Sequence, residues 1–257
     1  MHRSFLFLCL ALLPAACATP SLSIAPRYGT FDVDGSFGIS STGVVATNDL
    51  SDIGIAEDDG VLGGRIDFDF GSPHLTVATQ SSSHGGRGTL TAAIDHDGVT
   101  LDVGDDVETD LDLDLHDAAL TFDLVPGDAV ELGIGLGVTV FGIDMAVRDL
   151  ATGDQIETDQ TLPIPVLAAR LGAEWGRFDA EALVTGFDLS YQGDSASFYD
   201  VDVFGRYRLL GGRDHLRGSV VLGYRLMTFD IEYDDDESDA ELDLDLGGPY
   251  VGLQFGL

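Results

Sequence analysis

The sequence contains no lysine, so all 12 of its basic residues are arginines, against 45 acidic residues and a formal net charge of −33. A surface this acidic repels the phosphate groups of DNA and RNA, which excludes nucleic acid as a partner. A lysine-free, acidic composition fits a high-salt habitat and a G+C-rich genome equally well.

Cysteine is almost absent as well. The sequence has two, Cys9 and Cys17, and both lie close to the N-terminus. The rest of the chain has no thiol, which excludes a cysteine nucleophile, a cysteine-ligated metal site and a disulfide there. Its stability must come from backbone pairing and side-chain packing.

Apolar runs long enough for a membrane-spanning helix are also missing. The run over residues 5–13 is about half the required length. It follows two basic residues and precedes Pro14 and several small residues, which is typical of a secretory signal peptide. Cleavage after Ala18 fits this pattern; acylation of Cys17 is the alternative, although Pro14 stands where lipoprotein signals usually carry leucine. We expect a signal peptide over residues 1–18 and one mature domain over 19–257.

Apolar residues alternate with polar or small ones along most of the mature chain. The stretch 129–142 reads AVELGIGLGVTVFG, and between positions 130 and 140 its even positions are aliphatic while its odd positions are Glu, Gly or Thr. This period of two is that of a β-strand with one apolar face. The same alternation predicts ten strands, over residues 27–40, 61–70, 74–81, 110–125, 129–147, 161–175, 178–191, 197–209, 217–233 and 241–257.

The predicted connections alternate in length. Short turns are expected at 71–73, 126–128, 176–177 and 210–215, and mostly longer polar loops at 41–60, 82–109, 148–160, 192–196 and 234–240. An even number of antiparallel strands with this sorting of loops is typical of an outer-membrane barrel, in which aliphatic side chains face lipid. We therefore predict an all-β fold, a transmembrane antiparallel β-barrel of about ten strands (eight to twelve), with short periplasmic turns and longer acidic outer loops. Residues 88–103 could add a hairpin or extend the neighbouring strands above the membrane.

Aromatic residues gather near both expected rims, as interfacial girdles do. The alternative is that they are the core aromatics of a soluble fold. The predicted girdle consists of Phe70, Trp175, Phe178 and Tyr207 beside the short turns and of Tyr191, Tyr199 and Tyr233 towards the long loops, where Phe187 and Phe229 also lie.

The last nine residues read PYVGLQFGL, and Val251, Leu253, Phe255 and Leu257 share one face of the expected strand. This stretch resembles the closing strand of bacterial outer-membrane β-barrel proteins, which end on an apolar or aromatic residue. Here Leu257 is last and Phe255 supplies the aromatic ring. The resemblance implies that the barrel-assembly machinery reads this strand, and that outer-membrane lipid and lipopolysaccharide are partners. It implies no activity.

If the aliphatic faces contact lipid, the charges on the opposite faces point into the lumen. Charges in a narrow lumen must pair or stay hydrated, and the arginine fork can bond several carboxylates. We expect an ion-pair network that plugs the barrel, with a narrow solute pathway as the alternative. The expected members are Arg65, Arg170, Arg206, Arg208, Arg225, Asp67, Asp69, Asp123, Glu131, Glu174, Glu181, Asp200 and Asp202.

Acidic runs at 57–59, 102–117 and 234–245 predict at most weak divalent-cation binding at the outer rim, because no EF-hand or glycine-repeat calcium spacing is present. No cofactor is expected. In the last two runs aspartate alternates with leucine, which puts the carboxylates on one strand face.

Catalysis has little support. Outer-membrane proteases of the omptin type use a His–Asp pair, but His116 and Asp117 are adjacent in a strand and face opposite ways. The apolar alternation slips near them, for which a β-bulge is one explanation. His96 lies among loop acids. The sequence therefore favours a non-enzymatic barrel with a structural or surface role, ahead of a channel for small solutes and an embedded hydrolase or protease.

Overall fold

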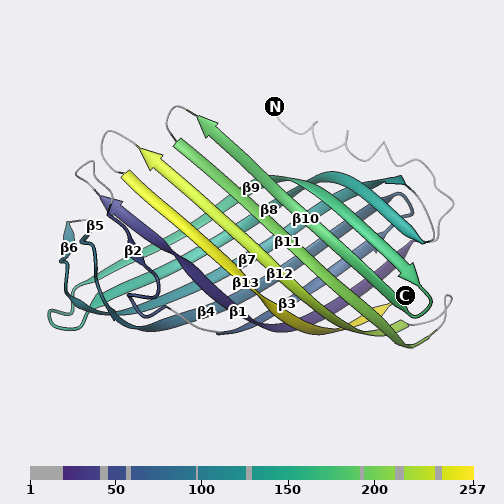
Figure 1. Cartoon of the computed structure of the whole chain (residues 1–257), viewed down its shortest axis with the longest axis horizontal. Coiled ribbons are helices and arrows are strands. Elements are labelled where there is room, and N and C mark those ends of the chain that lie inside the picture. Colours follow the sequence, from purple (N-terminus) through teal and green to yellow (C-terminus); the bar gives the residue numbers. More distant parts are fainter. Residues whose placement is uncertain are drawn as a thin grey trace, which may run out of the picture.

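The protein is a closed antiparallel β-barrel, seen in a computed structural model (Figure 1). The model describes residues 20–257 apart from 41–45, 56–58, 97, 126–128, 192–193, 212–216 and 235–238. Within that part of the chain, β13 pairs with β1 and closes a wall of ten strands. They are β1 (Ser21–Ser40), β3 (Asp59–Asp69), β4 (Pro73–Thr89), β7 (Asp106–Val125), β8 (Val130–Asp149), β9 (Gln155–Trp175), β10 (Phe178–Tyr191), β11 (Asp194–Leu210), β12 (Arg217–Asp234) and β13 (Asp239–Gly256).

Three short elements, β2 (Asn48–Asp49), β5 (Ile94–His96) and β6 (Val99–Leu101), lie at the end of the barrel opposite the C-terminus (Figure 1). The described residues include no helix that is long and apolar enough to cross a membrane. The predicted signal peptide and Cys17 lie outside the described residues, so they remain predictions.

The ten-strand barrel predicted from the sequence is confirmed. Several strands are longer than expected, because β4 runs to Thr89, β7 begins at Asp106 and β9 begins at Gln155. Residues 82–89 and 106–109 of the first of these predicted loops, and most of the predicted loop 148–160, are therefore barrel wall. The hairpin of β5 and β6 is the extra hairpin considered for 88–103.

The side chains of β7 alternate between the inside and the outside without interruption from Asp106 to Phe122, and its register with β8 shifts only between Asp123 and Val125. β7 pairs with β4 in one continuous register from Phe122 to Asp106. The predicted β-bulge near His116 is therefore wrong. The apolar residues of β7 change from odd to even positions because the inside is apolar in one half of the barrel and the outside is apolar in the other. The pairing of the backbone with β4 does not change.

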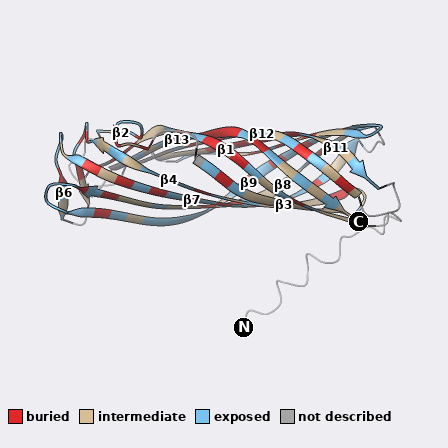
Figure 2. Ribbon diagram, turned by 90° about the horizontal axis from the view of Figure 1, so that it is seen from below, coloured by how far each residue is buried: buried red, intermediate tan, exposed pale blue. Residues whose placement is uncertain are grey.

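The barrel has two halves of opposite polarity. In the membrane half, next to the short turns, aliphatic side chains point outward, and Leu136, Leu167 and Leu222 are each more than 60% exposed. In the outer half, carboxylates such as Asp112 point outward and leucines such as Leu113 are buried inside. Figure 2 shows buried and exposed residues alternating along the strands.

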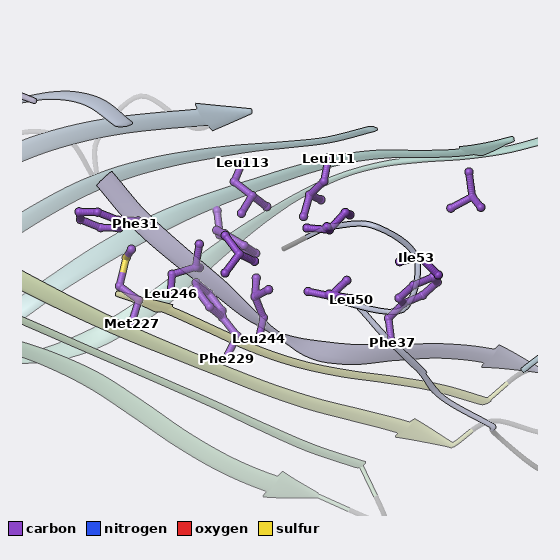
Figure 3. Packing of buried hydrophobic residues seen from close by; sticks show 14 of the residues in the cluster. Phe31, Phe37, Leu50, Ile53, Leu111, Leu113, Met227, Phe229, Leu244 and Leu246 are labelled. Atoms are coloured by element: carbon purple, nitrogen blue, oxygen red, sulfur yellow. The ribbon is translucent and has the colours of Figure 1, made fainter. Parts of the chain in front are cut away.

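An apolar core fills the outer half (Figure 3). Phe229 stacks on Phe141 at 3.9 Å between ring centroids, and Phe198 packs beside it at 4.6 Å. Leu50 and Ile53, from the segment between β1 and β3, also belong to this core, and both are at most 2% exposed. The interior of this half is therefore solid.

The segment over residues 48–55 is fixed to the wall by polar contacts. The side-chain oxygen of Asn48 accepts the backbone N–H groups of Thr91 and Ala92 at 2.9 and 2.8 Å. The backbone approaches β4 so closely that a Cβ atom on Gly86 would lie 1.9 Å from the carbonyl oxygen of Gly54. Only glycine fits there.

Candidate functional site

The lumen of the membrane half is a stack of ion pairs, and Arg225 forms its uppermost layer. Arg225 Nε and Nη2 donate to the two oxygens of Asp200 at 2.9 and 2.7 Å, and Nη2 also donates to Asp117 at 2.6 Å. Gln80 accepts from Nη1 at 3.2 Å. Arg225 and Asp200 are buried, so the guanidinium exchanges water for several charged partners.

Arg65 is the centre of the next layer towards the short turns. It donates to Asp67 at 2.7 Å and to Glu181, and it lies 3.6 Å from Asp202. Arg27 reaches Asp202 from β1 at 2.8 Å. Asp202 is thus shared between two arginines that come from different strands.

The ring of Phe204 lies among three guanidinium groups. The guanidinium carbons of Arg27, Arg65 and Arg206 are 4.9, 4.8 and 5.1 Å from its centroid. These distances are in the range of cation–π attraction, which strengthens where water is excluded. Tyr250 stacks beside Arg27 and donates its hydroxyl to Asp202.

The last layer surrounds a cavity of about 220 Å³ at the short-turn end. Arg170 bonds Asp123 and Glu131 at 2.7 and 2.8 Å. Arg206 bonds Asp179 and, at 3.2 Å, Glu181, which the Arg65 layer shares. Both arginines and carboxylates line this cavity.

Every lumen arginine expected from the sequence contacts an expected acid, and Arg206, which reaches Glu181, also bonds Asp179. Arg208 lies near the rim and reaches Glu174 at 3.2 Å. Asp69 is half exposed, and its described ion-pair contact is with His74 at 3.6 Å.

Sequence reasoning missed Arg27, Asp117, Asp179, Phe204 and Tyr250 in the lumen. Strand alternation could have identified Arg27 as a lumen residue. Ile24 and Tyr28 on the same strand point outward, so Arg27, on the other face of that strand, points inward. Asp117 was missed because the supposed bulge reset the alternation. The aromatic residues were missed because sequence alternation does not reveal that a ring will lie between arginines.

Most of the aromatic residues expected in the girdle are exposed on the outside of the barrel. Phe70, Trp175, Phe178 and Tyr207 are exposed near the short turns, and Tyr199 is exposed further along the wall. The side chains of Tyr191 and Tyr233 lie outside the described part of the chain. Phe187 is partly buried against the core, and the expectation for Phe229 was wrong, because it is fully buried in the core of the outer half.

The C-terminal strand joins β12 to β1 and exposes its apolar face. Val251, Leu253, Phe255 and Leu257 point outward and are about half exposed or more. Leu257 and Leu22 exchange backbone hydrogen bonds across the closing seam. This face is continuous with the lipid-facing band.

The outer half has an acidic exterior. On β13, Asp243 and Asp245 point outward and lie near Asp230 of β12 and Asp34 of β1. Partial burial and these three neighbouring carboxylates raise the pKa of Asp243 above its ordinary value. Among the described residues, no group of three or more His, Cys, Asp and Glu side chains is arranged to hold a metal ion.

Asp149 closes the turn between β8 and β9. Its carboxylate accepts the N–H of Ala151 at 2.6 Å and the hydroxyl of Thr152 at 2.8 Å. These hydrogen bonds lower the pKa of Asp149, because they favour its charged form.

The candidate histidines lie apart from one another. His116 is on the outer wall, where Nδ1 is 2.9 Å from the hydroxyl of Thr79, while Asp117 points inward to Arg225. His96 lies on the β5–β6 hairpin opposite Val99, and its neighbour Asp97 is outside the described residues. Among the described residues, His116 and Asp117 therefore do not form a catalytic His–Asp pair.

No family model matches the chain, and no curated protein sequence matches it. Solved structures do. The outer membrane protease OmpT from Escherichia coli superposes with a TM-score of 0.61 at 12% identity, covering 92% of this chain and 97% of that one.

Two further matches have lower TM-scores. The outer membrane protein OprG from Pseudomonas aeruginosa has a TM-score of 0.39 at 12% identity, covering 93% of this chain and 96% of that one. Neisserial surface protein A has a TM-score of 0.36 at 12% identity, covering 92% of this chain and 98% of that one. The closed ten-strand wall and the apolar exterior band agree with the likeness to the OmpT structure, and the chain has the fold of the bacterial outer-membrane β-barrel proteins.

Proposed function

We propose that this protein is a non-enzymatic, non-conducting barrel of the outer membrane that presents an acidic domain at the cell surface. The observation that carries the proposal is the apolar core of the outer half. Phe141, Phe198 and Phe229 pack against one another inside the barrel and are at most 1% exposed. An ion would lose its hydration at this level and find no polar partner there.

The charged lumen supports the same proposal. Its arginines and carboxylates neutralise one another at distances typical of charge-assisted hydrogen bonds. A solute in transit would have to break these pairs, which is costly for buried charges. A channel for small solutes is therefore the weaker candidate.

A structural role in the envelope follows from the exterior. Exposed carboxylates such as Asp114 and Asp245 lie on the wall next to the lipid-facing band, on its outer side. There they would lie at the level of lipid headgroups. They would repel lipopolysaccharide phosphates unless divalent cations bridge the two. Each carboxylate supplies fewer oxygens than Mg²⁺ or Ca²⁺ requires, so weak, shared cation binding is the expected mode.

Planar-bilayer conductance tests the proposal. The full-length protein should insert without a steady open state. In a matched variant, Phe141, Phe198 and Phe229 are replaced by Ser, which admits water to the core, and this variant should conduct. Unit conductance steps in the wild type would contradict the proposal and favour the channel. Heat-dependent gel migration of both proteins verifies that each barrel is folded.

A further inference from the structure

The barrel wall has an unpaired edge in its outer half, between β9 and β10. Gly186 lies opposite Leu167 and is the last residue of β10 that pairs with β9. β9 continues outward over residues 155–166 and remains paired with β8 on its other side. Within the described chain, no strand covers this edge of β9, and the two strands separate towards the outer end (Figure 1).

The direction of the backbone groups along this edge follows from a single hydrogen bond. Glu174 donates its N–H to Ala129 on the β8 side. Because N–H directions alternate along an unbroken strand, the odd-numbered residues of β9 point theirs towards β10. Glu157, Asp159 and Thr161 therefore offer free N–H and C=O groups at the edge, while Pro163 and Pro165 have no N–H to offer.

The two prolines protect only part of the edge. Proline is tolerated in a strand where its nitrogen faces away from the ladder, and it blocks pairing there. Pro163 and Pro165 lie nearest to the point where β10 leaves β9. Beyond them, residues 155–161 carry no such block, so an extended polypeptide can add to this part of the edge.

The outward face beside the edge is acidic. Glu157 and Asp159 are exposed on β9, and Asp144 of β8 lies directly opposite Asp159. Like charges directly opposite one another destabilise a strand pair. Basic side chains of an added strand would relieve this repulsion.

The inward face beside the edge is apolar at Ile156, Leu162 and Ile164, with Thr158 and Gln160 between them. Leu162 is 36% exposed on β9, and Leu189 is 57% exposed on β10 although both belong to the inward-facing set of their strands. Ile164 and Phe187 lie behind them, partly buried against the apolar core. An added strand would cover this surface with its alternate side chains.

We propose that the free edge of β9 binds an extended polypeptide in which basic residues alternate with apolar ones. Its backbone pairs with Glu157, Asp159 and Thr161. Its basic side chains point outward to Asp144 and Asp159, and its apolar side chains point inward to Leu162 and Leu189. A second copy of this chain is a poorer occupant, because pairing two β9 edges would bring Glu157 and Asp159 of both copies together.

The test uses the full-length barrel in detergent micelles and a short fluorescent peptide of alternating lysine and valine. Thr161→Pro extends the native proline series and removes one free N–H, whereas Thr161→Val keeps it. Fluorescence anisotropy should show peptide affinity at least about tenfold weaker for Thr161→Pro than for Thr161→Val. The double variant Asp144→Asn and Asp159→Asn should bind more weakly and with less dependence on salt.

Three outcomes would overturn the proposal. Equal affinity for Thr161→Pro and Thr161→Val would mean that the peptide adheres to the acidic wall without pairing. The absence of binding by the wild type at low ionic strength would leave the edge without this occupant. A dimer that Thr161→Pro dissociates would identify a second copy as the occupant. Heat-dependent gel migration establishes that each variant is folded.

Discussion

At the scale of single residues, the lumen depends on arginine. One guanidinium presents five donors in a rigid plane, so Arg225 can bond Asp200 through two nitrogens and still reach Asp117. A lysine ammonium has three donors at one point and could not span the same partners. The composition of the sequence predicted arginine in the lumen, but the individual pairs depend on strands that are far apart in the chain.

We expect a buried ion pair to contribute more to the free energy of unfolding than an exposed one. Arg225→Met leaves Asp200 and Asp117 buried without their cation, and we expect the free energy of unfolding to fall by about 3 to 5 kcal/mol. Arg208→Met removes a pair at the rim, where Glu174 is 40% exposed, and should cost less than about 1 kcal/mol. Equilibrium unfolding by denaturant in lipid vesicles measures both. Equal losses would contradict the layered lumen.

At the scale of the strand, polarity reverses along a continuous backbone. On β13, Leu244 and Leu246 point into the core of the outer half, while Val251 and Leu253 point out to lipid. The alternation of β7 reverses in the same way without a change of register. Sequence reasoning took this reversal for a bulge, because a period of two marks the apolar face without saying whether that face is inside.

Carboxylates on neighbouring strands make the outer half sensitive to pH. The raised pKa of Asp243 means that the folded barrel holds this proton more tightly than the unfolded chain. Its stabilising effect is therefore present below the ordinary carboxyl pKa and is lost as the pH rises through the raised pKa. Asp243→Asn should increase stability at neutral pH by about 0.5 kcal/mol and reduce its decline between acidic and neutral pH.

Asp110→Asn is the matched control for this experiment. Asp110 also points outward from the outer half, but Gly85 and Ala146 lie opposite it on the neighbouring strands. Denaturant unfolding across the pH range should show little change for this variant. A gain equal to that of Asp243→Asn would mean that total charge, and not the local cluster, sets the pH dependence.

At the scale of the whole molecule, the same ten strands surround two interiors of different polarity. The membrane half holds charges inside and apolar side chains outside, and the outer half holds the reverse. Both halves share strands, so the ladders of one half continue into the other. We expect one cooperative, closed structure.

A denaturing gel of the outer-membrane fraction, with and without boiling, tests this expectation. The unboiled protein should migrate differently from the boiled protein, because a closed ladder has no free edge in the bilayer from which detergent can unravel it. A protein found in the soluble periplasmic fraction with no heat-dependent shift would contradict the orientation of the lipid-facing side chains.

The sequence by itself determined the number of strands, their order and the face on which Val251, Leu253 and Phe255 lie, because the period of two is a local property of the backbone. Only the tertiary structure decided which face is inside in each half, since alternation looks the same when inside and outside are exchanged. It also decided which arginine meets which carboxylate and where β10 leaves β9, because both depend on the register and tilt with which ten strands close into one barrel.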